Sequence, residues 1–354
     1  MYQFQTARHT LLFKEKARTS RGAYTTHNAW YIRLSNSAHP ERFGVGECAP
    51  LPGLSPDFHV DPIRQYQPLI EEICCTGSCH EAHLRRYPAL LFAMETAMLH
   101  YDRNDLILFD SPFTRGEQGI PINGLIWMND AENMLRQIKE KLDGGSRCLK
   151  LKIGAVDFDD ELRLLRFVRQ QFSEGELTIR LDANGAFSPE EALQKLHRLA
   201  AFGIHSIEQP IAPGQWEEMA RLTSESPIDI ALDEELIAPG CSLHYEELLD
   251  AVRPHYLVLK PSLHGGISGC TRWIEEAEKR GIGWWITSML ESNIGLNAIA
   301  QWCATLQNTL PQGLGTGMLY TNNLPMPLTI RGNSLWFDYE PVHFLSTFSA
   351  LKFT

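Results

Sequence analysis

The chain has 354 residues, of which 44% are hydrophobic and 21% are charged. These proportions are typical of a soluble globular protein and exclude a disordered, collagen-like or coiled-coil chain. The formal net charge of −11 disfavours binding to phosphate backbones and to anionic membrane surfaces, so we expect neither a nucleic-acid nor a membrane partner. At this length the chain can form one large barrel and a smaller partner domain.

The first residues and the cysteines indicate the cellular compartment that we expect. The first residues lack the apolar stretch of a signal peptide. The 8 cysteines are too sparse and too widely spaced for a disulfide scaffold. Both observations favour a cytoplasmic protein.

The first 118 residues predict an α+β capping domain. Three runs, 2–13, 29–34 and 43–48, have the composition of a strand meander, and helical stretches follow at 62–75 and 89–103. A linker is expected at 116–119. The tail, residues 320–354, contains a strand-like run at Trp336 and Phe337, and we expect it to return to the capping domain.

The segment 119–319 predicts a TIM-type (β/α) barrel. Short β-rich runs recur about every 25 to 30 residues, with helical segments between them. One of these helices opens with Ser188, Pro189 and Glu191 as cap, first turn and N3 acid. Strands that alternate with helices favour a closed parallel barrel, with an open doubly wound sheet as the alternative. The eight expected strands are 122–127, 148–153, 177–182, 204–208, 228–233, 256–260, 283–288 and 313–316.

Charged residues stand at the carboxyl ends of these strands, where functional groups project in such barrels. Three of them are acids on consecutive strands, Asp182, Glu208 and Asp233. Carboxylates that converge on one barrel mouth repel each other unless a cation lies between them. Because the donors are all hard oxygens, we expect Mg²⁺, with Mn²⁺ as a plausible substitute.

Lysines flank the expected metal site. Strand alternation directs both Lys150 and Lys152 into the barrel, and Lys260 comes from the opposite side. A lysine beside another cation has a lowered pKa and can act as a general base. A bound Mg²⁺ can stabilise the dianion formed when the carbon next to a carboxylate loses a proton. The predicted chemistry is therefore proton abstraction from a small-molecule carboxylate.

These residues resemble the muconate-lactonizing subgroup of the enolase superfamily, which pairs a Lys or His base with Mg²⁺. The resemblance spans nearly the whole chain and implies that the three acids hold the metal and that Lys152 is the base. Its motifs are Lys150-x-Lys152, Asp182-x-Asn184, Glu208, Asp233-Glu234 and Lys260.

Within the subgroup the chain is most similar to the o-succinylbenzoate synthase family of menaquinone biosynthesis. Gly46-Glu47, the run 50–53 and the run 180–184 carry this similarity. It implies that Lys152 removes the alpha proton of 2-succinyl-6-hydroxy-2,4-cyclohexadiene-1-carboxylate and then protonates the departing hydroxyl in a syn elimination. Lys260 would act as a cation against the ring, and Lys150 would assist electrostatically.

Other candidates surround this centre. Arg180 shares the interior face with Asp182, where it would orient Lys152 or the metal-bound carboxylates, or form a salt bridge within the barrel. Asn184 and Glu234 are expected beside the metal ligands. Candidates for substrate contacts are Ser288, Gly315 and Thr316, for the succinyl tail or for tight packing, and Ser20, Leu51 and Gly53, in loops that would close the mouth or form ordinary turns.

Two other functions compete. An N-succinyl-amino-acid racemase or dipeptide epimerase would use Lys152 and Lys260 as bases on opposite faces of the substrate. Dipeptide epimerases usually carry Asp-x-Asp on the eighth strand, where this chain has Gly315-Thr316-Gly317, so the epimerase is disfavoured. A non-catalytic ligand-binding barrel is disfavoured because no lysine or metal carboxylate is missing.

Overall fold

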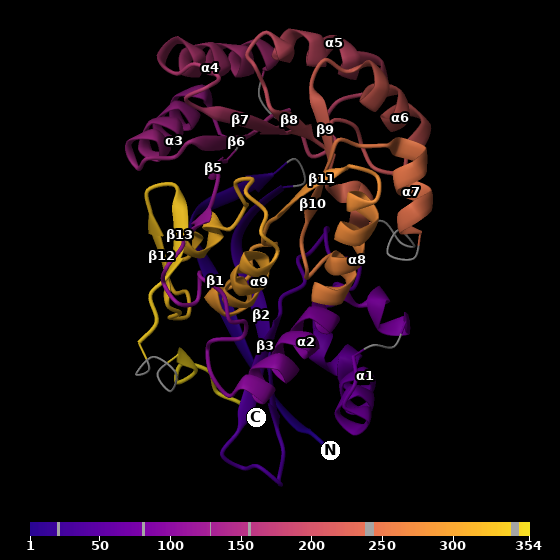
Figure 1. Ribbon diagram of the computed structural model, residues 1–354, viewed down its shortest axis with the longest axis vertical. Coiled ribbons are helices and arrows are strands. Elements are labelled where there is room, and N and C mark those ends of the chain that lie inside the picture. Colours follow the sequence, from indigo (N-terminus) through magenta and orange to yellow (C-terminus); the bar gives the residue numbers. More distant parts are fainter. Residues whose placement is uncertain (20–21, 80–81, 128, 155–156, 238–243, 341–346) are drawn as a thin grey trace.

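The protein is described from a computed structural model, and the description covers residues 1–354 except 20–21, 80–81, 128, 155–156, 238–243 and 341–346. A ring of helices surrounds a curled parallel sheet, and an N-terminal sheet with its own helices lies against it (Figure 1). Both chain ends lie beside this N-terminal part. Among the described helices, none has the length and apolar character needed to cross a bilayer.

The N-terminal part is an antiparallel three-stranded sheet followed by helices, as the sequence predicts. Helix α2 lies directly against β3, and a Cβ atom on Gly46 would stand 1.8 Å from the backbone oxygen of Ala93 in that helix. Glycine at position 46 is therefore what permits this close approach. The elements are β1 (Gln3–Thr19), β2 (Gly22–Ser35), β3 (Phe43–Cys48), α1 (Pro62–Thr76), the 3₁₀ helix η1 (Ala82–Arg86) and α2 (Pro88–Arg103).

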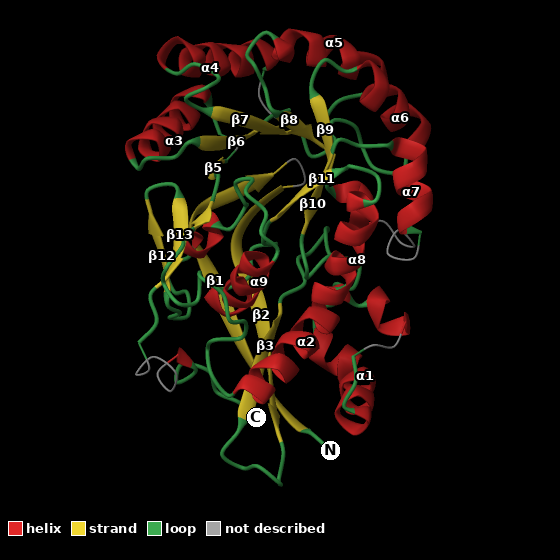
Figure 2. Cartoon of the chain, in the orientation of Figure 1, coloured by secondary structure: helices red, strands yellow, loops and turns green. Residues whose placement is uncertain are grey.

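The second part is a parallel barrel in which strands alternate with helices (Figure 2). Its seven-stranded sheet has the order β11-β10-β9-β8-β7-β6-β5, so each strand pairs with its neighbour along the chain. The elements are β5 (Gly124–Ile126), α3 (Ala131–Asp143), β6 (Cys148–Lys152), α4 (Phe158–Gln171), β7 (Thr178–Asp182), α5 (Pro189–Ala200), β8 (Ser206–Glu208), α6 (Trp216–Glu225), β9 (Asp229–Leu232), the 3₁₀ helix η2 (Glu234–Ile237), α7 (Tyr245–Val252), β10 (Tyr256–Leu259), α8 (Gly266–Glu278), β11 (Gly283–Ile286) and α9 (Asn293–Thr305).

Local signals set where these helices begin and end. The Ser188 side chain accepts a hydrogen bond from the Glu191 backbone N–H, which confirms the predicted cap of α5. Gly203 and Gly281 have positive φ angles of 56° and 68° and stand between a helix and the next strand. Glycine adopts this conformation without steric cost, so the chain can turn back toward the sheet.

The eighth expected strand, 313–316, is wrong in its extent. Only single parallel bridges form there, Ile122 to Gln312 and Thr287 to Gly313, and a 3₁₀ helix, η4 (Gly315–Leu319), follows. A Cβ atom on Gly313 would stand 2.2 Å from Thr287 Oγ1, so this segment approaches β11 closely and has no side chain to pack. The bridges join the two edges of the sheet. The barrel is thereby closed, which excludes the open doubly wound sheet.

The tail contacts both parts of the molecule. Strand β13 (Ser334–Phe337) pairs with β12 (Leu328–Arg331) and with β4 (Ile120–Pro121). Further along, Thr354 exchanges backbone hydrogen bonds of 2.9 and 3.0 Å with Thr6 in β1. Phe348 packs among residues of the N-terminal sheet. We propose that residues 1–118 with 320–354 form the cap and that 119–319 form the barrel.

Two carboxylates of the cap, the buried Glu47 and the half-buried Glu95, bind the starts of barrel helices. Glu47 in β3 accepts hydrogen bonds from the Ser292 backbone N–H at 2.7 Å, the Ser292 hydroxyl at 2.5 Å and the Gly295 N–H at 2.8 Å, at the start of α9. Glu95 in α2 accepts from the Ile267 N–H at 2.6 Å, at the start of α8. Helix N-termini offer unpaired N–H groups that favour a carboxylate. These contacts fix the cap over the barrel.

Candidate active site

The predicted site residues converge because of strand register. Lys152, Asp182 and Glu208 are successive partners across β6, β7 and β8. Asp233 and Lys260 directly follow β9 and β10. Because side chains alternate along a strand, these residues project from the carboxyl ends of the strands into the barrel.

The three acids form one buried cluster. One carboxylate oxygen from each of Asp182, Glu208 and Asp233 lies within 4.8 Å of the other two. Oε1 of Glu208 is buried and has no hydrogen-bond partner in the described part of the chain. A buried carboxylate oxygen without a donor is costly, and a cation would satisfy it. The all-oxygen set of ligands therefore fits a hard divalent metal.

Amines contact this cluster from two sides. Lys152 Nζ donates to Asp182 Oδ2 at 2.8 Å and to Asn184 Oδ1 at 2.7 Å. Lys150 Nζ lies 3.0 Å from the same Asp182 oxygen and also contacts Glu208. From the opposite side, Lys260 Nζ donates to the two oxygens of Asp233 at 2.5 and 2.6 Å.

Burial and these charges set the protonation behaviour. Burial raises the pKa of Glu208 to about 7, against the attraction of Lys150 and with the repulsion of Asp182 and Asp233. Burial also opposes ionisation of Asp182, but Lys150 and Lys152 outweigh it and hold the pKa of this carboxyl below its usual range. Burial lowers the pKa of Lys150, whereas the neighbouring carboxylates raise it more, so the net shift is upward.

The raised pKa of Lys150 is opposite to the lowered pKa that we expect from the sequence for a lysine beside a cation. The three carboxylates on their own produce it. A dication among them would repel the ammonium charge and work in the other direction.

Asn184 and Glu234 support the Lys152 side of the cluster. Asn184 Nδ2 donates to Glu234 Oε1 at 2.9 Å, while its oxygen accepts from Lys152. Asn184 has a φ angle of 45°, a left-handed conformation that asparagine tolerates better than most residues. The turn after β7 thereby directs the Asn184 amide toward Lys152.

Arg180 lies inside the barrel, as expected, but its contacts are different from either expectation. Its guanidinium stands 3.9 Å from the centre of the Trp285 ring and donates to the Pro311 backbone oxygen at 2.7 Å. In the described chain it forms no ion pair within 4.0 Å, and it does not contact Lys152. Its partners belong to β11 and to the segment that closes the barrel.

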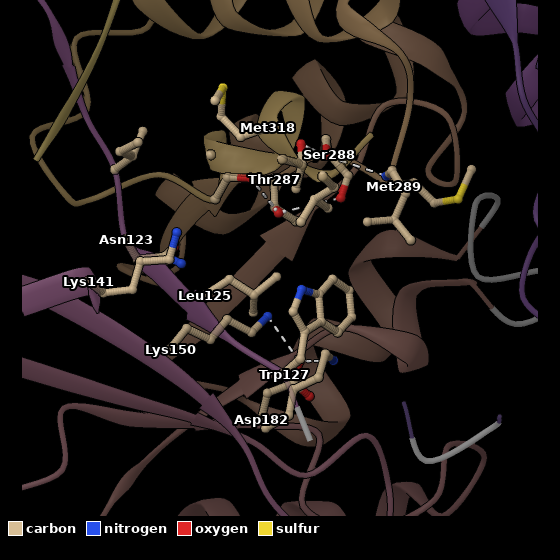
Figure 3. A pocket seen from close by; sticks show the side chains of 18 of the residues that line it. Asn123, Leu125, Trp127, Lys141, Lys150, Asp182, Thr287, Ser288, Met289 and Met318 are labelled. Atoms are coloured by element: carbon tan, nitrogen blue, oxygen red, sulfur yellow. Dashed lines mark hydrogen bonds and ion pairs between the residues drawn. The ribbon is translucent and has the colours of Figure 1, made fainter. Parts of the chain in front are cut away.

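A cavity of about 470 Å³ opens above the lysines. In Figure 3, Leu125, Trp127 and Lys150 lie on one side of this space, and Thr287, Ser288 and Met289 lie on the other. Ser288 Oγ and Thr316 Oγ1 share a hydrogen bond of 2.5 Å at the cavity wall, beside Gly315.

One cap loop, which carries Leu51 and Gly53, reaches this cavity. Leu51 lines it and packs with Leu263 and Met289 of the barrel. Gly53 is not among the lining residues; it has a φ angle of 74° and serves the turn of this loop. Ser20 lies outside the described residues.

Several lining residues were missed by the sequence argument. Asn123, Leu125 and Trp127 all line the cavity, on one face of β5 and its two flanking residues. Their alternate spacing within the expected strand 122–127 is the signal that predicts a shared face. None of the three is charged, so the criterion of a charged strand end does not select them.

Comparison with known proteins agrees with this geometry. The family model described as "Enolase C-terminal domain-like" matches residues 133–337. The chain belongs to the enolase superfamily, in its muconate-lactonizing subgroup.

Among its relatives is the o-succinylbenzoate synthase of Desulfotalea psychrophila, which is 48% identical over 93% of this chain and 97% of the relative. The crystal structure of MenC from the same organism superposes with a TM-score of 0.80 at 44% identity, covering 95% of this chain and 99% of that one. The L-Ala-D/L-Glu epimerase of Bacillus subtilis has a TM-score of 0.82 at 20% identity, covering 96% of each chain, and shares the fold.

Proposed function

We propose that this chain is an o-succinylbenzoate synthase: it catalyses the Mg²⁺-dependent syn dehydration of 2-succinyl-6-hydroxy-2,4-cyclohexadiene-1-carboxylate to 2-succinylbenzoate. This is a step of menaquinone biosynthesis, and we place it in the cytoplasm. The observation that carries the proposal is the carboxylate cluster with Lys150 and Lys152 on one side and Lys260 on the other. The relative of 48% identity, matched over nearly its whole length, supports it.

Asp182, Glu208 and Asp233 would hold the metal ion, Mg²⁺ or in its place Mn²⁺. When bound, a divalent cation stabilises the negative charge that develops on the substrate carboxylate as the neighbouring carbon loses its proton. Asn184 and Glu234 hold the turn beside Asp182. The cluster then needs no rearrangement when the substrate arrives, because its side chains are already fixed.

Lys152 performs both proton transfers. As a neutral amine it takes the alpha proton from the ring carbon next to the carboxylate, and it becomes an ammonium. The electron pair left behind expels the ring hydroxyl, which takes the same proton from the Lys152 ammonium and leaves as water. Lys152 is then neutral again and the ring is aromatic. A single group on one face serves both steps, which is what a syn elimination requires.

The other two lysines supply charge. Lys260 comes from the far side of the cluster, where its ammonium faces the substrate ring and stabilises the anionic intermediate. Lys150 contacts both Asp182 and Glu208 and holds these carboxylates in place.

The opposite wall of the cavity would bind the succinyl tail. Ser288 and Thr316 present hydroxyls there, and Gly315 leaves room beside them. Leu51 brings an apolar side chain of the cap onto the barrel loops, which helps to exclude water.

A direct assay tests the function. Purified protein with Mg²⁺ is mixed with the cyclohexadiene substrate, and formation of 2-succinylbenzoate is followed by absorbance and confirmed by NMR. We expect turnover that requires the protein. Absence of dehydration by folded, Mg²⁺-loaded protein would refute the proposal.

The placement of Lys152 and Lys260 on opposite sides of the cluster also fits a second candidate, racemisation of N-succinyl-amino acids. A racemase needs a base on each face, whereas the dehydration needs one. Racemisation of N-succinyl-amino acids that is faster than dehydration would favour this alternative. The Gly315-Thr316-Gly317 segment gives the cavity no acid for a dipeptide ammonium at this position, which argues against the dipeptide epimerase.

A further inference from the structure

Trp127 directly follows β5 and lines the cavity of the candidate site. Leu125 in β5 pairs with Lys150 in β6. Because side chains alternate along a strand, Trp127 shares a face with Leu125, and both line the cavity that Lys150 and Lys152 also line. In Figure 3 the half-buried Trp127 lies on the side of the cavity that carries Leu125 and Lys150.

A buried side chain holds the backbone of Trp127 from behind. Gln137 in α3 is 8% exposed and binds both backbone groups of Trp127. Its Oε1 accepts from the Trp127 N–H at 2.9 Å, and its Nε2 donates to the Trp127 oxygen at 3.3 Å. Strand β5 ends at Ile126, so the Gln137 amide replaces the pairing that a neighbouring strand would give. Trp127 is thereby fixed at a point where the strand has ended.

The two walls of the cavity differ in chemistry. Around Ser288, Gly315 and Thr316 the wall offers two hydroxyls and little side-chain bulk, with Met289 and Met318 on the same side. On the other side Leu125 and Trp127 form a broad apolar area beside Lys150. A substrate with a flat ring at one end and a polar chain at the other matches this division.

We propose that Trp127 determines specificity for a ring-bearing substrate and that Gln137 is its positioning residue. The indole packs against the six-membered ring of the substrate and orients the ring carbon toward Lys152. Aromatic and planar groups gain from such contact beyond simple burial. An acyclic succinylated carboxylate has no ring to make it. This inference rests on the proposed function and specifies which part of the substrate is read.

The test compares two ligands in the presence of Mg²⁺ by isothermal titration. 2-Succinylbenzoate carries the ring, and N-succinylglycine carries the carboxylate and the succinyl group without a ring. In Trp127→Leu we expect the affinity for 2-succinylbenzoate to fall by about tenfold, since a ring contact contributes on the order of 1 kcal/mol. The affinity for N-succinylglycine should change by less than about twofold. Trp127→Phe should restore most of the difference.

Gln137→Met keeps the volume of the side chain and removes both of its hydrogen bonds to Trp127. Like Trp127→Leu, it should lower the affinity for 2-succinylbenzoate relative to the affinity for N-succinylglycine. Trp336→Leu is the matched control, because Trp336 is also half-buried but does not line the cavity. It should leave the ratio unchanged. If the ratio of the two affinities is unchanged in Trp127→Leu, whether both affinities fall equally or neither falls, the proposed role of Trp127 is overturned. The dehydration assay of the unmodified protein separates this inference from the proposed function. If the unmodified protein dehydrates the substrate, a failed prediction for Trp127 leaves the function unaffected. If it does not, the function itself is refuted.

Discussion

Two groups of carboxylates can be compared in this molecule. Asp182, Glu208 and Asp233 face one another in the barrel, and Glu47 and Glu95 join the cap to the barrel. Glu47 is as deeply buried as the three barrel carboxylates, and Glu95 is half-buried, so burial alone does not separate a candidate reaction centre from a structural contact.

What separates the two groups is the source of their hydrogen bonds. Glu47 and Glu95 accept hydrogen bonds from backbone N–H groups, and Glu47 also from a hydroxyl, at the starts of helices. The barrel carboxylates are held by three lysine amines, and one oxygen of Glu208 has no donor. A carboxylate satisfied by fixed dipoles has no capacity left for a ligand. A cluster of carboxylates in which one buried oxygen has no donor has a position left for a cation.

Metal removal should separate the two groups most strongly. Stripping divalent ions with a chelator should abolish turnover, and adding Mg²⁺ should restore it, because three converging carboxylates cannot stabilise a further negative charge. Asp233→Asn should lower kcat/KM by at least about 10³-fold and weaken Mg²⁺ binding measured by titration.

Glu95→Gln is the control, since it removes the charge of a half-buried carboxyl outside the cluster. It should keep turnover and Mg²⁺ binding. Full activity in chelator, or a Glu95 variant as impaired as Asp233→Asn, would contradict the division between the two groups.

The lysines on the two sides of the barrel cluster should also differ in how much turnover is lost when each is replaced. Lys152→Ala should lower kcat by about 10³- to 10⁴-fold while 2-succinylbenzoate still binds, because the base and acid of both steps is gone. Lys260→Arg keeps the positive charge and should retain measurable dehydration. The checks are absorbance for turnover and NMR in D₂O for exchange of the alpha proton. Dehydration that persists without Lys152 would contradict the one-base mechanism.

The convergence of the candidate site residues was predictable because they follow short β-rich runs at regular spacing. Asp182, Glu208 and Asp233 each end such a run, and barrel topology brings the ends together. The Ser188 cap was predictable because its signal is local. Composition and spacing are sufficient where the determinant lies within one β/α unit.

The remaining features depend on partners distant in sequence. The segment that closes the barrel is joined by single bridges, Gln312 to Ile122 and Gly313 to Thr287, and the approach of Gly313 to Thr287 leaves no room for a side chain. Arg180 binds Pro311, 131 positions away, and Glu47 binds Ser292, 245 positions away. No local pattern marks such pairs, so the structure was needed to find them.

Removing the contact between Glu47 of the cap and α9 of the barrel should lower the stability of the protein. Glu47→Ala leaves the Ser292 and Gly295 N–H groups without their acceptor at the start of α9. We expect the free energy of unfolding to fall by about 2 to 4 kcal/mol, measured by urea denaturation. Glu41→Ala is the control, because this side chain is 64% exposed, and it should change stability by less than about 0.5 kcal/mol. A Glu47 variant as stable as the control would show that the contact is dispensable.

The pH dependence of stability gives the smallest and most specific difference. Burial raises the pKa of Glu47 from 4.5 to about 7, against its hydrogen bonds from Ser292 and Gly295. An acid whose pKa is higher in the folded state binds its proton more tightly there. Its contribution to stability is therefore complete below about pH 4.5 and is lost as the pH rises to about 7.

Within this window the group changes the free energy of unfolding by up to about 1.4 kcal/mol per pH unit. Glu47→Gln cannot ionise, so the stability of the unmodified protein relative to this variant should fall between pH 5 and pH 7. Urea denaturation at half-unit steps measures the difference. The paired carboxyl of Asp182 has the opposite shift, so its own contribution is lost as the pH falls. A relative stability that rises between pH 5 and pH 7 would mean that folding lowers the pKa of Glu47, as it lowers that of the lysine-paired Asp182, and would contradict the dominant effect of burial at this contact.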